Sequence, residues 1–361
     1  MLIAVERVQE FCKAVEKSAT EAKFIYFSDQ DGVSLYSEGQ LATIHNLANP
    51  SVKEFSMGIE SKSFLALAKK LYPGDLSITF HNNNVVMKKD NINAKFPSIA
   101  GKARLSQVDG ESIHQEASVK WITEHLGKTT VAVEDAKSSK QFMGVLLDTK
   151  DGLTRLCKFS GLSLYLACAE QLFATNCRHI VPDSAIKLAK GFSKDLVEYR
   201  FADKCVMLGM KHGTQASCSK PHDTYLTEYL HFFGLVENLN MLPDTFEKYA
   251  FDVMHLSNSI ELVSAALGES ESWVKFSVVG RSGDKIVWDV SGKSQNGVEI
   301  CEKLLSSGLR ETDTFSINDK RTIKSLTCFG ESVNFTNLSG STIALSNEKG
   351  DLVILLTKVS V

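Results

Sequence analysis

The sequence predicts an α+β fold in which one domain, made of two helices on antiparallel sheet, is repeated three times. Three hairpin turns each separate two strand-like runs, and these turns are Asp31-Gly32, Asp151-Gly152 and Ser282-Gly283. Each turn is followed by an aliphatic residue that leads into a short helix, and these residues are Ile59, Val181 and Ile317. They are 122 and 136 residues apart, far longer than a solenoid repeat, so the spacing indicates three copies of a whole domain.

Length and composition agree with several domains. The chain has 361 residues, which is long for a single hydrophobic core, and its hydrophobic content of 43% is ordinary for a globular protein. The expected linkers lie near residues 110–115 and 238–244, the second of which contains Pro243. We therefore place the domains at residues 1–112, 113–241 and 242–361.

The first copy sets the order of elements. Val5, Val8, Phe11 and Val15 follow a helical spacing, which indicates one buried helix face. A second helix ends before Pro73-Gly74, and the turn-rich residues 81–84 separate two strands. The expected helices are residues 5–18 and 62–71, and the expected strands are residues 24–27, 33–36, 76–80, 85–88 and 94–99.

The second and third copies repeat this order, with Gly127 as the expected stop of a helix. In the second copy the expected helices are residues 118–126 and 183–192, and the expected strands are residues 145–147, 153–156, 162–169, 179–181, 196–201 and 206–211. In the third copy the expected helices are residues 257–267 and 319–329, and the expected strands are residues 274–279, 286–290, 332–335, 342–345 and 352–359.

The second helix of each copy is rich in basic residues and almost free of acids. The net charge of −3 does not itself indicate nucleic-acid binding, so the distribution of charge carries the argument. The basic residues are Lys62, Lys69, Lys70, Lys187, Lys190, Lys194, Lys320, Arg321 and Lys324. Three solvated lysine faces are the simpler interpretation, but acids are excluded at the equivalent position of all three copies. Such a surface suits weak, sequence-independent contacts with DNA phosphates.

Sequence motifs for catalysis, cofactors and metals are absent. The chain contains no GxGxxG after a strand, no phosphate-binding GxxxxGK[ST], no HExxH and no GxSxG. Its eight cysteines form no CxxC pair, which favours reduced, buried thiols over a zinc site. The charged N-terminal residues 1–17 do not resemble a signal peptide, and no stretch approaches the about 20 apolar residues of a membrane span. We expect a cytoplasmic protein that is not an enzyme and binds no cofactor, metal or membrane.

Residues 142–169, FMGVLLDTKDGLTRLCKFSGLSLYLACA, resemble the second-domain hairpin, turn and strand of the bacterial replicative sliding clamp, the beta subunit of DNA polymerase III. In the family's T-D-G-x-R-L-A turn, Gly161 and Leu164 match. Residues 179–182, HIVP, are similar to the family's entry into a helix, and residues 353–359 occupy the place of its V-x-M-P ending, with Leu-Leu for Met-Pro. The mismatches to these motifs are typical of a divergent member of the family, encoded by a bacterium or a phage.

The resemblance implies a head-to-tail homodimer of three-domain chains that closes as a ring around double-stranded DNA and tethers the replicative polymerase. Polymerase and clamp loader would bind through a short apolar peptide between the second and third domains. The matching pocket residues are Gly161, Leu162, Leu164, Pro243, Val353, Leu355 and Leu356. The expected seam strands are residues 76–88 and 286–290. The alternative is a triplicated structural or scaffold protein that does not bind DNA, in which the pocket leucines are ordinary core.

Overall fold

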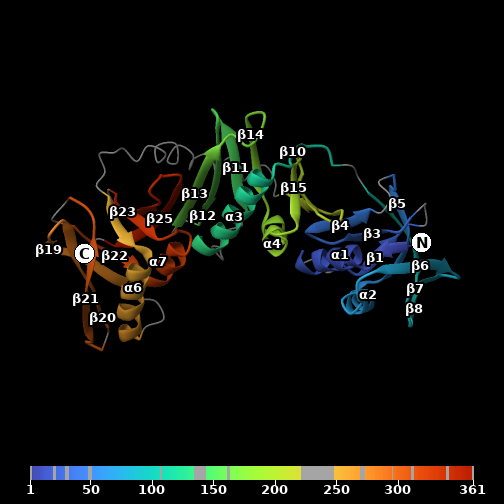
Figure 1. The fold of residues 1–361 in the computed structure, drawn as a ribbon, viewed down its shortest axis with the longest axis horizontal. Coiled ribbons are helices and arrows are strands. Elements are labelled where there is room, and N and C mark those ends of the chain that lie inside the picture. The colour runs from blue at the N-terminus through green and yellow to red at the C-terminus, as the bar shows by residue number, and fades with distance from the viewer. Residues whose placement is uncertain are drawn as a thin grey trace. The chain divides into compact units, whose positions relative to one another are not determined.

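The structure is a computed structural model of the chain (Figure 1). The residues it describes are 2–18, 22–28, 32–47, 51–105, 108–133, 144–160, 163–220, 248–268, 273–294, 296–309, 313–338 and 341–359. No helix in these ranges is long and apolar enough to cross a membrane.

The order of helices and strands repeats three times along the chain. The first copy contains β1 (Leu2–Ala4), α1 (Val5–Lys17), β2 (Phe24–Phe27), β3 (Ser34–Glu38), β4 (Ala42–Leu47), β5 (Glu54–Glu60), α2 (Ser61–Ala68), β6 (Asp75–His81), β7 (Asn84–Lys89), β8 (Ile92–Pro97) and β9 (Ile99–Arg104). The second contains β10 (Glu111–Ile113), α3 (Glu116–Ala132), β11 (Val145–Lys150), β12 (Leu153–Phe159), β13 (Ser163–Glu170), β14 (Cys177–Val181), α4 (Asp183–Gly191), β15 (Leu196–Phe201), β16 (Cys205–Met210) and β17 (Thr214–Ser219). The third contains β18 (Tyr249–Asp252), α6 (Val253–Leu267), β19 (Trp273–Ser282), β20 (Lys285–Lys293), β21 (Glu299–Ser306), β22 (Thr314–Asn318), α7 (Asp319–Leu326), β23 (Ser332–Asn337), β24 (Thr342–Ser346) and β25 (Leu352–Val359).

Two of the three sheets run from one copy into the next. A nine-stranded sheet has the order β10-β15-β16-β17-β4-β3-β2-β5-β9, so β17 of the second copy pairs with β4 of the first. A twelve-stranded sheet follows the path β14-β11-β12-β13-β25-β22-β19-β20-β21, so β13 of the second copy pairs with β25 of the third. The four-stranded sheet β1-β6-β7-β8 belongs to the first copy alone. The expected α+β class with antiparallel sheet is confirmed.

The chain divides into two compact units that do not coincide with the three copies. One unit comprises residues 1–126 and 179–221, and the other comprises residues 127–178 and 222–361. The division falls within α3 and β14, in the middle of the second copy, because each half of that copy shares a sheet with its neighbour. The three domain boundaries therefore stay a prediction.

Local sequence signals explain where several helices begin and end. Asp252 caps α6, since its carboxylate accepts a hydrogen bond from the backbone N–H of His255 at 2.8 Å, and Gly268 ends the helix with φ of 64°. This cap places the start of α6 at Val253, one turn before the expected start. Asn318 caps α7 in the same way through the N–H of Arg321.

Gly127 does not stop α3, contrary to expectation, because the helix continues to Ala132. The apolar face of the helix extends past the glycine: Ile122, Leu126 and Val133 are all buried. Packing of this face outweighs the cost of about 1 kcal/mol that a glycine adds inside a helix.

The hairpin turns follow the expected pattern where they are described. Asp151 and Gly152 both have positive φ, at 54° and 80°, and join β11 to β12 as a two-residue turn. The third turn is Gly283-Asp284, one residue later than expected, because Ser282 still pairs with Lys285. Asp31 of the first turn lies outside the described residues.

The core of the third copy is aromatic. Trp288 is fully buried, and its indole N–H donates to the hydroxyl of Ser306 at 2.9 Å. The rings in contact with Trp288 are those of Tyr249, Phe251, Phe276 and Phe315. Edge-on and tilted contacts of this kind add to the hydrophobic stabilisation of a core.

Candidate functional site

Two of the second helices, α2 and α4, lie in the same unit and present the basic residues identified in the sequence. The exposed residues are Lys62, Lys69 and Lys70 beside α2, and Lys187, Lys190 and Lys194 beside α4. Lys69, Lys70 and Lys194 lie in the turns after these helices, since α2 ends at Ala68 and α4 ends at Gly191. The opposite faces bury Phe64 and Ala68 on α2, and Ile186 and Ala189 on α4. The sequence therefore separates a packed face from a basic face on each helix.

Helix α1 contacts both α2 and α4 and adds cations that the sequence analysis left aside. Lys13 and Lys17 are exposed, and their ammonium groups lie 4.6 and 5.7 Å from the ring centroid of Phe192. Lys17 also donates to the carbonyl of Gly191 at 3.1 Å, which ties α1 to the end of α4. In the sequence, Lys13 and Lys17 alternate with acidic residues, so they do not form the acid-free basic pattern by which the other lysines were identified.

One acid of α1 offsets one of the basic residues. Lys69 Nζ lies 2.6 Å from Glu16 Oε1, and both side chains are largely in solvent, so the pair contributes little to stability. Lys62 and Lys187, by contrast, are exposed on α2 and α4 and form no ion pair among the described residues, although the exposed Glu60 and the half-buried Asp183 lie close to them in the sequence. These two are the cleanest candidates for a phosphate contact in this unit.

Helix α7, which is the second helix of the third copy, lies in the other unit and packs against α6. Lys320 and Lys324 are exposed and Arg321 is half-buried, while Asp319 is buried and its carboxylate accepts from the backbone N–H of Lys320 at 2.7 Å. The acid at the start of α7 therefore stabilises the helix terminus and does not interrupt its basic surface.

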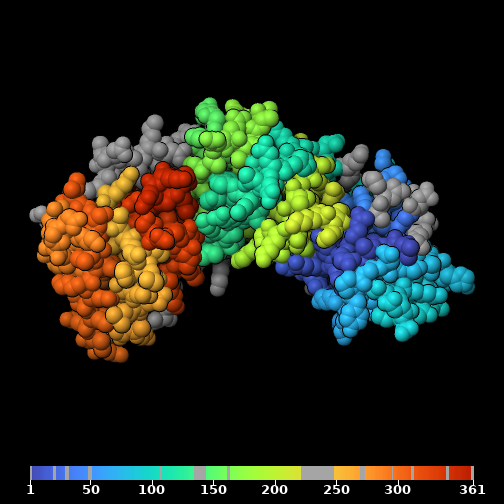
Figure 2. Space-filling view, viewed as in Figure 1, coloured from blue at the N-terminus to red at the C-terminus, as the bar shows by residue number. Residues whose placement is uncertain are grey.

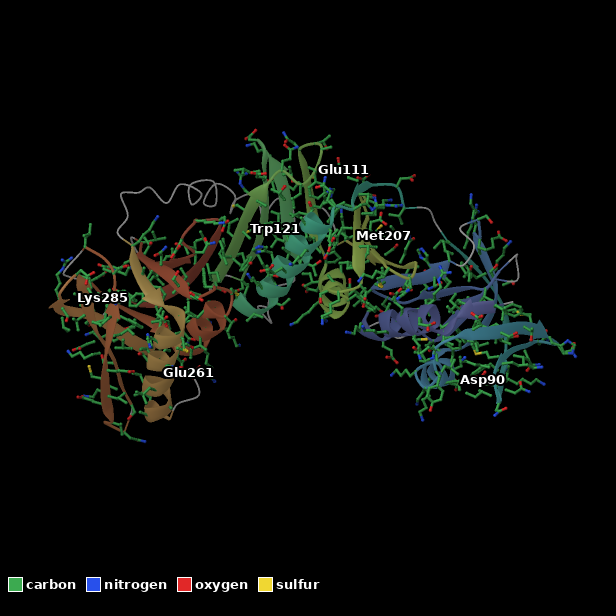
Figure 3. All side chains as sticks on the ribbon, viewed as in Figure 1. Asp90, Glu111, Trp121, Met207, Glu261 and Lys285 are labelled. Carbon is green, nitrogen blue, oxygen red and sulfur yellow. The ribbon has the colours of Figure 1, made fainter. Side chains whose placement is uncertain are left out.

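Helix α6 differs from the other helices because its surface carries no cation. Figure 2 shows its atoms, in gold, at the surface of the molecule, and Figure 3 labels Glu261 on it. Met254 is 64% and Leu262 52% exposed on the same helix. The basic surface of the third copy therefore depends on α7 alone.

Strand pairing brings together the apolar residues of the expected peptide pocket. Leu164 on β13 lies directly opposite Leu355 on β25, and Leu166 lies opposite Val353 one row away on the same face of the sheet. Leu164 and Val353 are buried, and Leu355 is half-buried. Leu356 points to the opposite face, since it is adjacent to Leu355 in the strand, and it is also buried.

The other expected pocket residues, Gly161, Leu162 and Pro243, lie outside the described residues. The structure thus places Leu164, Val353 and Leu355 on one face and Leu356 on the other. Their role in binding a peptide stays a prediction.

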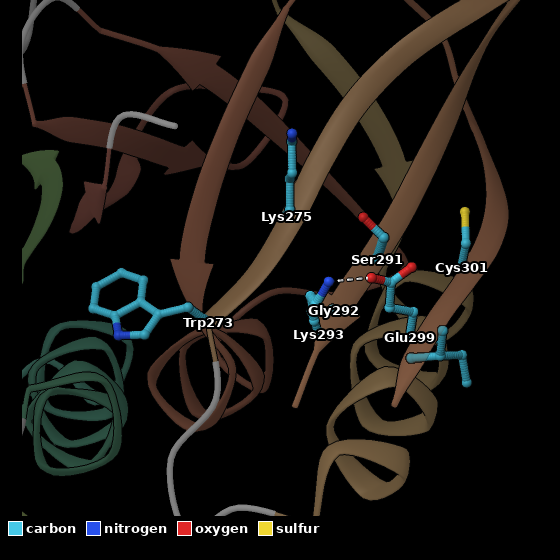
Figure 4. A pocket seen from close by; sticks show the side chains of 8 residues that line it. Trp273, Lys275, Ser291, Gly292, Lys293, Glu299 and Cys301 are labelled. Atoms are coloured by element: carbon cyan, nitrogen blue, oxygen red, sulfur yellow. Dashed lines mark ion pairs between the residues drawn. The ribbon is translucent and has the colours of Figure 1, made fainter. Parts of the chain in front are cut away.

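A shallow groove lies over the exposed face of the sheet formed by β19, β20 and β21 (Figure 4). Trp273 and Lys275 line one side of it, and Lys293 forms an ion pair with Glu299 at 2.5 Å across its floor. Cys301 is the one exposed cysteine of the eight, which corrects the expectation of buried thiols at that position. Partial burial and the nearby Asp289 raise the pKa of its thiol, which disfavours the reactive thiolate.

The expected seam strands are not at the edge of a sheet. Residues 76–88 fall in β6 and β7, and residues 286–290 fall in β20, and each of these strands is paired on both sides. Among the described residues, the end strands of the sheets are β1, β8 and β9 in the first copy and β21 in the third. This prediction was wrong because the position of a strand at the edge of a sheet depends on its pairing with strands far away in the sequence. The alternation of apolar residues within a strand gives no information about that pairing.

The repeated copies, the cross-copy sheets and the helix pairs together define the fold of the DNA polymerase sliding clamps. Comparison with solved structures gives bacterial DNA polymerase III beta subunits. The beta subunit from Pseudomonas aeruginosa matches with a TM-score of 0.78 at 11% identity, over 100% of this chain and 99% of that chain. The beta subunit of Streptococcus pyogenes matches with a TM-score of 0.77 at 14% identity, over 100% and 99%. The sliding clamp from Bacillus subtilis matches with a TM-score of 0.75 at 15% identity, over 100% and 98%.

The likeness is one of fold along the whole length of the chain. No protein-family model matches the sequence, and no curated protein matches it significantly. The expected resemblance to the beta subunit is confirmed at the level of structure, and the low identity agrees with a divergent sequence.

Proposed function

We propose that the chain is a DNA sliding clamp, a processivity factor without catalytic activity that encircles duplex DNA and tethers a polymerase. The observation that carries the proposal is the repeated basic surface. The same element of each copy, α2, α4 or α7, exposes lysines while its apolar side packs inward. A surface of lysines without base-reading elements suits contacts with the phosphate backbone that do not depend on sequence.

Ring closure would use two copies of the chain, joined head to tail. The edge strands β8 and β21 are suited to pair with each other across such a contact, because each has one side of its backbone that pairs with no other strand described here. Their net charges are also of opposite sign, since β8 carries Lys95 and β21 carries Glu299, Glu302 and Lys303. We therefore move the proposed seam from β6, β7 and β20 to these two strands.

Polymerase and clamp loader would bind the face formed by Leu164, Val353 and Leu355 through a short apolar peptide. A few buried anchors typically dominate the affinity of such contacts. The proposed setting is the cytoplasm of a bacterial cell or of a phage-infected host.

A topological assay tests the function without a loader. A linear duplex biotinylated at both ends is incubated with the protein, its ends are then blocked with streptavidin, and the sample is passed over a sizing column at high salt. A clamp stays on the blocked duplex, leaves an unblocked one by sliding off, and is released when a nuclease cuts the blocked duplex.

Light scattering supplies the second readout. The clamp should have a mass near twice that of the 39.8 kDa chain. A monomer or an open-ended polymer would favour the alternative, a scaffold protein without DNA binding. The same holds if blocking the ends of the duplex does not change how much protein the DNA retains.

A further inference from the structure

Strand pairing follows one rule at both junctions between copies within the chain. β17 is the third strand after the second helix of its copy, and it pairs with β4, the third strand after the first helix of the preceding copy. β25 and β13 hold the same two places at the other junction. The edge strands β8 and β21 are the remaining strands at these two places. The rule therefore predicts that β8 of one chain pairs with β21 of a second chain.

Each junction also places a first helix beside a second helix. At one junction α1 packs against α4, and Lys17 of α1 donates to the carbonyl of Gly191 at 3.1 Å. At the other, the thiol of Cys328, just after α7, lies 3.8 Å from the carbonyl oxygen of Lys128 in α3. Lys17 and Lys128 are each twelve residues past the first residue of their helix, so the two junctions have the same geometry.

Helix α6 has the place of α1 and α3 in the third copy, and its packed side matches that of α1. The buried positions coincide, and the pairs are Val8 and Leu256, Cys12 and Ile260, and Val15 and Val263. The side that would face a neighbouring copy does not match. Ala14, one turn before Lys17 on α1, is fully buried, whereas its counterpart Leu262 is 52% exposed. Ala265, the counterpart of Lys17, is exposed as well.

Helix α2 has a matching exposed side. Its buried positions coincide with those of α4, and the pairs are Phe64 and Ala185, Ala68 and Ala189, and Leu71 and Phe192. Leu67 is only half-buried, whereas its counterpart in α4, Leu188, is fully buried. Lys70 directly precedes Leu71, as Gly191 precedes Phe192, so Lys70 has the place at which α4 meets Lys17.

Both helices lie beside the edge strands that the pairing rule selects. The ring centroid of Phe64 on α2 lies 6.2 Å from that of Phe96 on β8, and α6 packs against β21. The helices also differ in charge, since α6 carries Glu261 and no lysine or arginine, whereas Lys69 and Lys70 follow α2. Opposite charge across a contact favours the correct partner and register.

We propose that the exposed side of α6 is an interaction surface for α2 of a second copy of this chain, with Leu262 against Leu67 and Ala265 beside Lys70. The inference rests on the proposed function, because it takes β8 and β21 as the seam between two chains. It assigns α6 to the contact between chains and not to DNA. Burial of apolar side chains that are exposed in the single chain stabilises such a contact.

Chemical cross-linking of the full-length chain tests the helix contact. The variant carries Lys70→Cys and Ala265→Cys in a Cys301→Ser background, because Cys301 is the exposed native cysteine. After treatment with a short bismaleimide, we expect a band of twice the chain mass on a denaturing gel, which neither single-cysteine variant gives. The matched control replaces Ala265→Cys by Met254→Cys, which is also exposed on α6 but lies about 16 Å away along the helix. The control pair should not cross-link.

Substitution of Leu262 supplies an independent readout. Leu262→Asp should raise the dissociation constant of the dimer about tenfold or more, since burial of a leucine side chain is worth at least this factor. Leu309→Asp, at a residue that is 80% exposed outside α6, should not change it. Light scattering over a dilution series measures the constant, and circular dichroism checks folding. If Leu262→Asp misfolds, the comparison of the two cysteine pairs still decides the matter.

The outcomes separate the helix contact from the proposed function. A wild-type dimer in which the Lys70→Cys and Ala265→Cys pair cross-links no better than the control pair would refute the contact and leave the clamp proposal standing. A dissociation constant that is unchanged in folded Leu262→Asp would do the same. A wild-type chain that stays monomeric at every concentration would refute the proposed function and this inference together.

Discussion

Neutralising one exposed lysine per copy should weaken the dependence of DNA binding on salt. We choose Lys62, Lys187 and Lys320, because all three side chains are exposed on second helices and none takes part in an ion pair within the described structure. Replacement by Gln removes the charge and keeps a good helix former. A two-chain ring would lose six charges.

The expected magnitude follows from counterion release. Each phosphate contact contributes about 0.9 to the slope of log K against log salt on B-form DNA, so six lost contacts lower the slope by up to about 5. The assay is the anisotropy of a fluorescent linear duplex, measured from about 50 to about 200 mM salt, where this term is large. The mass and the circular dichroism spectrum should not change.

A matched triple variant makes the comparison decisive. Lys53, Lys204 and Lys285 are also exposed, one in each copy, but they lie at the ends of strands and not on the second helices. Their replacement by Gln should leave the slope close to that of the wild type. Equal slopes for the two triple variants would refute the assignment of the helix lysines to the DNA.

Three further predictions concern the seam and the stability of the chain. Leu305→Asp, on the exposed side of the edge strand β21, should convert the dimer to monomers on a sizing column, whereas Val279→Asp, an equally exposed change on β19, should not; a dimer in both would move the seam elsewhere. Burial, with a lesser effect of Lys220, lowers the pKa of His179 to about 4, so its neutral form contributes stability that is lost as pH falls from about 6.5 toward 4. We expect the urea unfolding free energy to drop by about 2 kcal/mol over this range, after allowing for partial exposure, and by less in His179→Gln; equal drops would contradict the assignment. Gly127→Ala should stabilise the chain by about 0.5–1 kcal/mol in the same titration, because nothing lies within 4 Å of the added methyl group; destabilisation would show that the glycine is needed there.

The fold class and the order of elements could be predicted because they depend on local signals. The Asp151-Gly152 turn and the helical spacing of Val5, Val8 and Phe11 each report the conformation of a few adjacent residues. Their recurrence along the chain revealed the three copies. The errors at Gly127 and at the start of α6 also have local causes, since a buried face and an Asp252 cap outweighed weaker signals.

The candidate site was only partly accessible from the sequence. The basic residues of the second helices could be identified because lysines without acids form a simple pattern. The pairing of Leu164 with Leu355 depends on two strands nearly 200 residues apart, and the sequence suggested it only through a family resemblance. The convergence of Arg155 and Arg178 on the buried Asp148 could not be predicted at all, because the three residues lie on three different strands.

The strand pairs that join one copy to the next have a mechanical consequence. Residues 214–218 of β17 pair with residues 42–46 of β4, and residues 163–167 of β13 pair with residues 352–356 of β25, so five residue pairs hold each junction. Across the first junction, His45 and Gln215 add a side-chain hydrogen bond at 2.7 Å. Bending at either junction would break the backbone hydrogen bonds of a continuous sheet. These two junctions should therefore resist mechanical strain more strongly than a contact between copies that side chains alone would make.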